Sequence, residues 1–279
     1  MSLKLSVTDN YPIKREIAPG IHWLGGCGER LEPSGEILHS SASTFLLMGD
    51  EKTLLVDTGA PIHYPLIRQG MDEILAGRQL DYVVPSHPEL PHSGNMPKLF
   101  DKYPKLRAIG DDRDYRLFYP QYADRFDFWP QHKPLPLGGG MEFTVLEAPI
   151  KDLVSTTWGY EGREQVMFVS DAFGYLHRAA PDDENPLHKP GECRLLTTEL
   201  PKLPEVYQAA FLTRSALAWT GFMDANVFLN TVRKMIERYP SKLIAPTHGN
   251  VIDNLDEIMP IMRAAYTSAY ETERARSKA

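Results

Sequence analysis

The sequence has few cysteines and no long apolar run. Its two cysteines, Cys27 and Cys193, are far apart among 279 residues and do not form a short metal-binding motif. So few cysteines exclude a disulfide-rich scaffold, and we expect both to be reduced thiols of a cytoplasmic protein. No apolar stretch approaches the roughly 18 residues that a membrane helix needs. Residues 1–17 interleave charged and apolar side chains, unlike a signal peptide. We therefore expect no membrane association.

An excess of positive charge is also missing. The chain has 30 Lys and Arg against 37 Asp and Glu, which gives a net charge of -7. This is the wrong sign for a protein that binds nucleic acid or anionic lipid, so we expect neither as a partner. The hydrophobic content of 42% is that of an ordinary globular protein. At this length a core can form without disulfides, and we expect residues 1–279 to form a single domain.

Apolar patterning predicts that strands and helices alternate along the chain. A strand–helix–strand order favours a layered α/β fold, because the helices must cover the faces of the sheets. The segment 178–202 is rich in proline and acidic residues without periodicity, so we expect a loop there. The predicted strands are 20–24, 43–48, 53–57, 81–84, 106–109, 142–147, 165–170 and 242–245, and the predicted helices are 65–76, 96–103, 226–239 and 255–273.

The most distinctive local feature is a loop that follows the strand at 81–84. It contains His87, Glu89 and His92, and prolines stiffen it. Two imidazoles and a carboxylate in one short loop at the end of a strand are able to converge on a pair of metal ions. The alternative is an ordinary surface loop that contains two histidines.

Two further strand ends carry residues that bind metals. Asp171 follows the apolar strand at 165–170, and His248 follows the strand at 242–245. Both should emerge at the loop edge of a sheet, where ligands are bound, rather than in its core. The alternatives are a turn or capping role for Asp171 and a buried, hydrogen-bonded role for His248.

Together these motifs resemble the metallo-β-lactamase superfamily. Within it the sequence is most similar to the di-iron domain of flavodiiron proteins and to the oxygen-binding di-iron proteins. Glu89 stands where hydrolases of the superfamily have a second histidine, and the resemblance covers about residues 16 to 270. It implies an α/β fold with the four-layer αββα sandwich of that superfamily. The segments that carry it are 57–59, 87–94, 147–149, 168–174 and 247–249.

The sequence departs from the family pattern at two positions. Pro91 stands where the family has an aspartate ligand, and a proline offers no ligand atom. The histidine that the family places after 147–149 is replaced at that register by Asp152, which is our candidate for the missing ligand. The resemblance then implies one metal held by His87, Glu89 and Asp152. The second metal would have His92 and His248, and Asp171 would bridge the two.

The resemblance implies a dinuclear centre, with iron as the first expectation and zinc or manganese as alternatives. Its function would be to bind or reduce dioxygen or nitric oxide. Two alternatives stay open: a metal-dependent hydrolase of an ester, lactone or thioester, and a non-enzymatic oxygen sensor or degenerate metal site. Flavodiiron reductases carry FMN in an attached flavodoxin domain. We expect no such domain and no FMN here, so a separate electron-transfer flavoprotein would be the partner. A homodimer is an extrapolation from the same family.

An aromatic segment, Tyr115 to Trp129, remains outside these motifs. Its arginines are balanced by aspartates, which disfavours stacking on nucleic acid bases. We expect a packed helix, a subunit interface or a hydrophobic wall over the metal site. The histidines without ligand-like spacing, to which no role is assigned, are His63, His132, His177 and His188.

Overall fold

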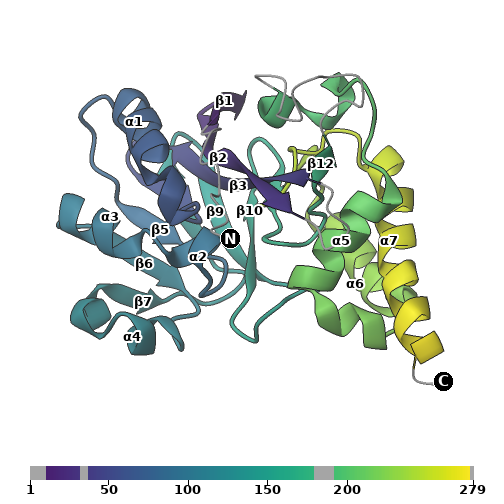
Figure 1. Ribbon diagram of the computed structural model, residues 1–279. Helices are drawn as coiled ribbons and strands as arrows, with labels where there is room; N and C mark the ends of the chain where they lie inside the picture. Colours follow the sequence, from purple (N-terminus) through teal and green to yellow (C-terminus); the bar gives the residue numbers. More distant parts are fainter. Residues whose placement is uncertain (1–10, 32–36, 179–191, 277–279) are drawn as a thin grey trace, which may run out of the picture.

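The computed structural model describes residues 11–31, 37–178 and 192–276, and within them the chain forms two sheets (Figure 1). The first sheet has the order β1-β2-β3-β4-β5-β6-β7, with β12 also paired to β3. The second has the order β13-β11-β10-β9-β8. The strands of the first sheet are β1 Tyr11–Ala18, β2 Ile21–Leu31, β3 Ile37–Met48, β4 Thr53–Val56, β5 Tyr82–Val84, β6 Arg107–Gly110, β7 Phe126–Phe128 and β12 His177–Arg178; those of the second are β8 Pro134–Gly138, β9 Met141–Glu147, β10 Thr157–Glu161, β11 Val166–Phe168 and β13 Leu243–Ala245.

Helices cover the outer face of each sheet. The helices with β4 to β7 are α1 Tyr64–Leu75, α2 Leu90–Ser93, α3 Met96–Lys102 and α4 Tyr115–Phe118; the second sheet has α5 Val206–Ala216, α6 Ala225–Arg238 and α7 Leu255–Arg276. In Figure 1 the first group lies on the left and the second on the right, with the strands between them. Five short 3-10 turns complete the described elements: η1 Pro61–His63, η2 Pro120–Arg125, η3 Glu192–Arg194, η4 Thr197–Glu199 and η5 Ala218–Phe222.

Three apolar clusters separate the four layers. The inner faces of the two sheets meet in one cluster, where Phe45 and Phe168 have ring centroids 5.3 Å apart. The second cluster lies between the first sheet and α1 and α3, and includes Phe100. The third lies between the second sheet and α5 to α7, and includes Tyr266. Burial of this apolar surface stabilises the stacking of the layers. The predicted four-layer αββα arrangement is therefore confirmed.

Most of the predicted elements are present within a few residues of their expected ends. The segment predicted as a helix at 226–239 is α6, and that at 255–273 is α7. The elements that were not predicted include β1, β7, β12 and α2, besides β8, which contains two prolines, β10, which lacks an apolar alternation, and α5, whose helical apolar stripe is weak. His188 and most of the predicted loop at 178–202 lie outside the described residues, and the remainder contains η3 and η4.

The topology brings four strand ends to one edge. Strand β4 runs parallel to β5, and β11 runs parallel to β13, so the carboxyl ends of each pair point the same way. Backbone hydrogen bonds then join the two sheets at this edge: Ser43 N donates to Thr247 O at 2.9 Å, and Thr157 N donates to Ser86 O at 2.8 Å. The loops after β5, β11 and β13 therefore meet, and they carry the residues that the sequence singled out.

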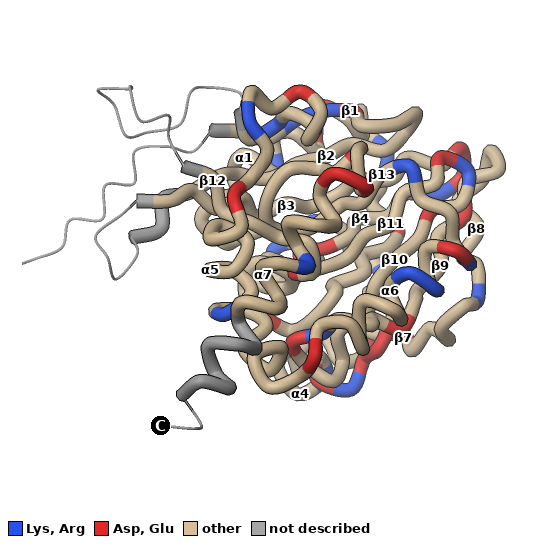
Figure 2. Tube along the Cα trace, turned by 90° about the vertical axis from the view of Figure 1, so that its right-hand side faces the viewer, with Lys and Arg blue, Asp and Glu red and all other residues tan. Residues whose placement is uncertain are grey.

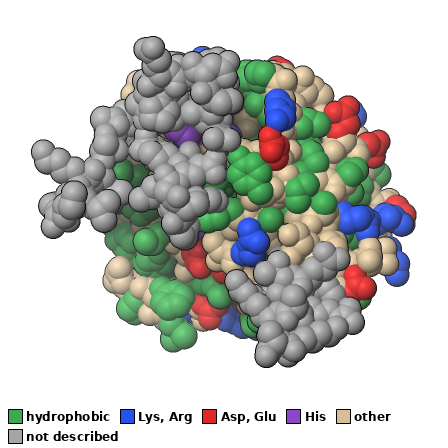
Figure 3. All heavy atoms as spheres, turned by 45° about the vertical axis from the view of Figure 1, so that its right-hand side comes forward, with side chains coloured by type: hydrophobic (Ala, Val, Ile, Leu, Met, Phe, Trp, Pro, Cys, Tyr) green, Lys and Arg blue, Asp and Glu red, His purple; other side chains and the backbone are tan. Residues whose placement is uncertain are grey.

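The charged side chains lie mainly on the periphery. In Figure 2 the central strands are mostly uncharged, and acidic and basic residues mix along the outer segments. In the view of Figure 3, charged side chains of both signs are scattered over the coloured part of the surface. Among the described residues no helix is long and apolar enough to cross a membrane.

Candidate metal centre

The residues of the candidate centre come from loops at the shared sheet edge. His87 and Glu89 lie in the turn after β5, and His92 lies in α2. Two residues at this edge have a left-handed backbone, Asp57 with φ 58° and Ser170 with φ 55°. Such values are uncommon outside glycine and tend to occur where a side chain must be presented at a site. Both residues contact the histidines described next.

Each of three histidines is fixed through its Nδ1 atom. Nδ1 of His92 is 2.9 Å from Asp57 Oδ2, and Nδ1 of His248 is 2.5 Å from Ser41 O. Nδ1 of His87 is 3.0 Å from Ser170 Oγ. A carboxylate and a carbonyl oxygen only accept hydrogen bonds, so Nδ1 carries the proton in His92 and His248. The lone pair of a neutral ring is then on Nε2, the arrangement that an outer hydrogen bond imposes on metal-ligating histidines.

The three Nε2 atoms face the carboxylate of Asp171. His87 Nε2 is 3.6 Å from Oδ2, whereas His92 Nε2 and His248 Nε2 are 3.2 and 3.4 Å from Oδ1. Donors bound to one metal at 2.0 to 2.2 Å lie about 3.0 to 3.5 Å apart. Asp171 thus directs Oδ2 toward His87 and Oδ1 toward His92 and His248, so its carboxylate would be able to bridge two metal ions.

Burial supports this assignment. His87 and His92 are fully buried and Asp171 is 4% exposed. Among the described residues, His87 Nε2, His92 Nε2 and Asp171 Oδ1 make no hydrogen bond. Buried polar atoms without such a bond are costly, so three of them aimed at one point need a ligand to compensate them. The donor set fits a metal ion.

Glu89 and Asp152 extend the centre toward solvent. One ligand atom each of His87, Glu89 and Asp152 lies within 4.8 Å of the others. His87 Nε2 is 3.7 Å from Glu89 Oε2, and the Glu89 side chain is 48% exposed. The neighbouring His87 imidazole lowers the pKa of Glu89, whereas burial and the nearby Glu89 charge raise the pKa of Asp152. This side of the centre is open, and the side of His92 is closed.

Asp57 is not among the site residues predicted from the sequence, but its carboxylate anchors His92. Its 3% exposed carboxylate accepts hydrogen bonds from Ser86 N at 2.7 Å and from Thr247 Oγ1 at 2.8 Å, besides that of His92. It therefore ties together the loops after β5 and β13 and α2. The sequence signals for it are its place in the segment 57–59, which carries part of the family resemblance, and its position at the end of an apolar strand.

The buried charges require a cation. Burial alone would lower the pKa of His92, but Asp57 and Asp171 outweigh it and raise that pKa to about 10. Burial likewise opposes ionisation of Asp57 and Asp171, but His92 holds the pKa of both carboxyls below the usual range. A proton on His92 and a metal ion at its Nε2 are alternative ways to balance the two buried carboxylates.

Pro91 contributes no donor but shapes the loop. It lies at the start of α2, a position that suits its fixed φ and missing N–H. This turn directs His92 inward, and Ser93 Oγ bonds back to Glu89 O at 3.1 Å. Among the described residues, the donors on the His92 side are thus His92, His248 and Asp171. A metal ion held by these three would have coordination positions open to other ligands.

The aromatic segment packs behind the loop. Tyr115 and Phe126 are buried and stack with centroids 5.8 Å apart, and Tyr119 Oη donates to Ser93 O at 3.0 Å. Tyr115 Oη donates to Pro85 O at 3.1 Å. The segment therefore stabilises the backbone of the histidine loop from its outer side.

Comparison with known proteins shows the family to which the chain is similar. A family model for the metallo-beta-lactamase superfamily matches residues 38–214. The coenzyme F420H(2) oxidase of Methanocaldococcus jannaschii is 23% identical over 252 residues, which are 85% of this chain and 56% of that protein. The nitric oxide reductase of Moorella thermoacetica is 26% identical over 168 residues, which are 57% of this chain and 41% of that protein.

The fold is also that of a solved relative. The rubredoxin oxygen:oxidoreductase of Desulfovibrio gigas superposes with a TM-score of 0.65 at 17% identity, covering 92% of this chain and 61% of the other. At this identity the likeness shows the fold alone. The chain spans about two fifths to three fifths of the length of these three relatives.

Replacement of Asp57 by asparagine should disable the His92 side. An amide that donates toward His92 Nδ1 favours the tautomer with its proton on Nε2, which cannot bind a metal. We expect Asp57→Asn to lose about one of two bound metal ions and to unfold at lower temperature, since a buried charged hydrogen bond contributes roughly 1.5 to 3 kcal/mol. Metal analysis and thermal unfolding measure both effects. The control is Thr247→Val, which keeps the Asp57–His92 bond; equal metal loss in this variant would contradict the tautomer argument.

The assignment of Asp152 is tested by its metal affinity. We expect Asp152→Ala to weaken binding at the Glu89 side by at least about tenfold, because a ligand is removed. Asp152→His should retain binding, since it restores the ligand type of the family. Glu147→Ala removes an exposed carboxylate nearby and serves as the matched control. Metal content measured after dialysis distinguishes them, and unchanged content in Asp152→Ala would show that the residue is not a ligand.

Metal binding should release a proton from His92. In the metal-free protein the raised pKa of about 10 keeps this imidazole protonated at neutral pH, so a metal must displace the proton. Observed affinity should then rise as pH rises, up to about tenfold per unit below pH 10. Calorimetric titration with Mn²⁺ in buffers of different ionisation enthalpy counts the protons. His92→Gln should release about one proton fewer; equal release in both proteins would refute the assignment.

Proposed function

This chain belongs to the metallo-β-lactamase superfamily, and we propose that it is a dinuclear metal protein, with iron as its metal, that binds or reduces dioxygen or nitric oxide. The proposed ligands are His87, Glu89 and Asp152 for one ion and His92 and His248 for the other, with Asp171 between them. The observation that carries the proposal is that three Nδ1-anchored histidines direct Nε2 toward the two oxygens of one buried carboxylate.

The donor set is compatible with iron. Three of the six proposed ligands are carboxylates, and a shell of mixed oxygen and nitrogen donors without sulfur suits iron or manganese as well as zinc. Glu89 supplies an oxygen where hydrolases of the superfamily have a nitrogen. When bound, redox-active iron supplies the electron transfer that dioxygen or nitric oxide chemistry requires.

The residues of the chain have separate tasks in this proposal. Asp57, Ser41 and Ser170 hold the imidazoles in one tautomer and orientation. The buried side of the site, formed by His87, His92 and Asp171, excludes water. The exposed side chain of Glu89 and the half-exposed Asp152 form the entrance. Burial and the Glu89 charge raise the pKa of Asp152 in the metal-free protein, and a metal ion bound there would favour its ionised form.

The relatives support the choice of reaction. Their names describe an oxidase of a reduced cofactor, a nitric oxide reductase and an oxygen:oxidoreductase. Reduction of either gas consumes electrons, so turnover requires an electron donor. We propose a separate electron-transfer flavoprotein in this role. A protein without that donor would bind the gas reversibly.

Metal analysis with optical spectra tests the proposal. Protein purified without chelator should contain about two irons per chain, and its visible spectrum should change on reduction with dithionite and again on exposure to air or nitric oxide. His92→Ala should lose the gas-dependent change while it remains folded by circular dichroism. A colourless protein with about two zinc ions that hydrolyses generic esters would refute the redox function in favour of a hydrolase.

A further inference from the structure

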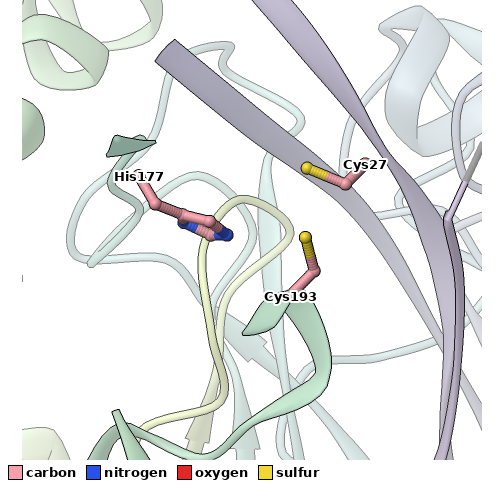
Figure 4. Close-up of side chains that lie close together, drawn as sticks. All are labelled: Cys27, His177 and Cys193. Atoms are coloured by element: carbon pink, nitrogen blue, oxygen red, sulfur yellow. The ribbon is translucent and has the colours of Figure 1, made fainter. Parts of the chain in front are cut away.

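A second group of metal-binding side chains lies outside the proposed centre. Cys27 in β2, His177 in β12 and Cys193 in η3 each offer one ligand atom, and these atoms lie within 4.8 Å of one another. Figure 4 shows the two sulfur atoms and the edge of the imidazole facing one shared space. The three residues are distant in sequence, so no short motif revealed the group.

We propose that Cys27, His177 and Cys193 form a separate site for one thiophilic metal ion, with Zn²⁺ as its natural occupant. Two thiolates and an imidazole are the donors that zinc prefers, and three protein ligands with a fourth position open to solvent is a recurrent zinc arrangement. Two thiol protons are released to solvent on binding, and the charges of Zn²⁺ and the two thiolates then cancel.

The spacing suits such an ion. Sulfur donors at 2.3 Å from zinc in a tetrahedron lie about 3.8 Å apart, so the three atoms need to approach by at most about 1 Å. Each donor stands on a defined backbone. Cys27 pairs with Ser41 across β2 and β3, and His177 pairs with His39 across β12 and β3. Arg15 Nη1 donates to Arg194 O at 3.0 Å, which holds η3 beside β1.

Burial of the two cysteines favours a bound cation at this group of side chains. Cys27 and Cys193 are 1% and 3% exposed, whereas His177 is partly exposed. Buried thiolates require a compensating cation, and His177 is the one of the three ligands that is partly exposed to solvent. No disulfide joins the two cysteines in the described structure.

The site would clamp the segment that carries the bridging carboxylate. His177 lies six positions after Asp171, and between them Tyr175 N donates to His248 O at 3.3 Å. Ser41, the strand partner of Cys27, accepts the Nδ1–H of His248. A metal bound by the three residues would therefore fix β12 and η3 onto β2 directly behind two of the proposed centre's ligands.

Cobalt substitution tests the proposal with a readout that the dinuclear centre cannot produce. The reduced, full-length protein is stripped of metal and titrated with Co²⁺. Thiolate ligation gives an intense near-ultraviolet charge-transfer band, which nitrogen and oxygen donors lack. We expect this band in the unaltered protein and in His92→Ala, and its loss in Cys27→Ala and Cys193→Ala. His177→Ala should lower the cobalt affinity at this band at least tenfold, whereas the control His132→Ala should not.

Other results would overturn the proposal. Absence of the band in the reduced protein, or its persistence in both alanine variants of the cysteines, excludes the site. If the reduced protein binds no cobalt through sulfur and the two thiols are lost on mild oxidation, with a Cys27–Cys193 peptide found under non-reducing conditions, the pair is a redox disulfide instead. Circular dichroism confirms that each variant is folded. If the protein gave the cobalt band but contained no iron when purified, the site of Cys27, His177 and Cys193 would be supported and the proposed redox function would be refuted.

Discussion

The carboxylate of Asp57 is the contact on which the arrangement of the candidate centre depends. It sits at the end of β4 with a left-handed backbone and accepts hydrogen bonds from three separate segments. Its charge also fixes which nitrogen of His92 carries the proton. A buried carboxylate stays ionised only when donors and positive charge surround it. One residue therefore joins the two sheets and orients a proposed ligand.

The layers could be predicted from the sequence because apolar periodicity reports burial directly. Strands such as β11 and helices such as α6 stand out, since each has a strong pattern and clear ends. Strand β10 and helix α5 could not be identified this way. Strand β10 is buried throughout although it contains Thr157 and Glu161. Helix α5 has only a weak apolar stripe, and its buried side chains contact two different apolar clusters. Tertiary packing overrides local preference in both.

The candidate site likewise contains residues that could be predicted from the sequence and residues that could not. The six proposed ligands follow strands or lie in one loop, so their positions in the sequence and the resemblance sufficed to select them. Asp152 was chosen by counting along the chain, and the structure places it beside His87 and Glu89. The role of Asp57 and the grouping of Cys27 with Cys193 depend on contacts between distant segments. Contacts between distant segments cannot be predicted from the spacing of residues in the sequence, because these residues come together only when the sheets have folded.

The candidate centre is also graded in exposure, from fully buried His92 to half-exposed Glu89. This gradient has a kinetic consequence for the proposed pair of ions. An ion on the outer side would exchange with solvent through the entrance, whereas an ion on the inner side would leave only after the outer position is vacated or α2 moves. The inner ion would then be retained for long times even at modest affinity, and the order of assembly would be fixed: inner position first, outer position second.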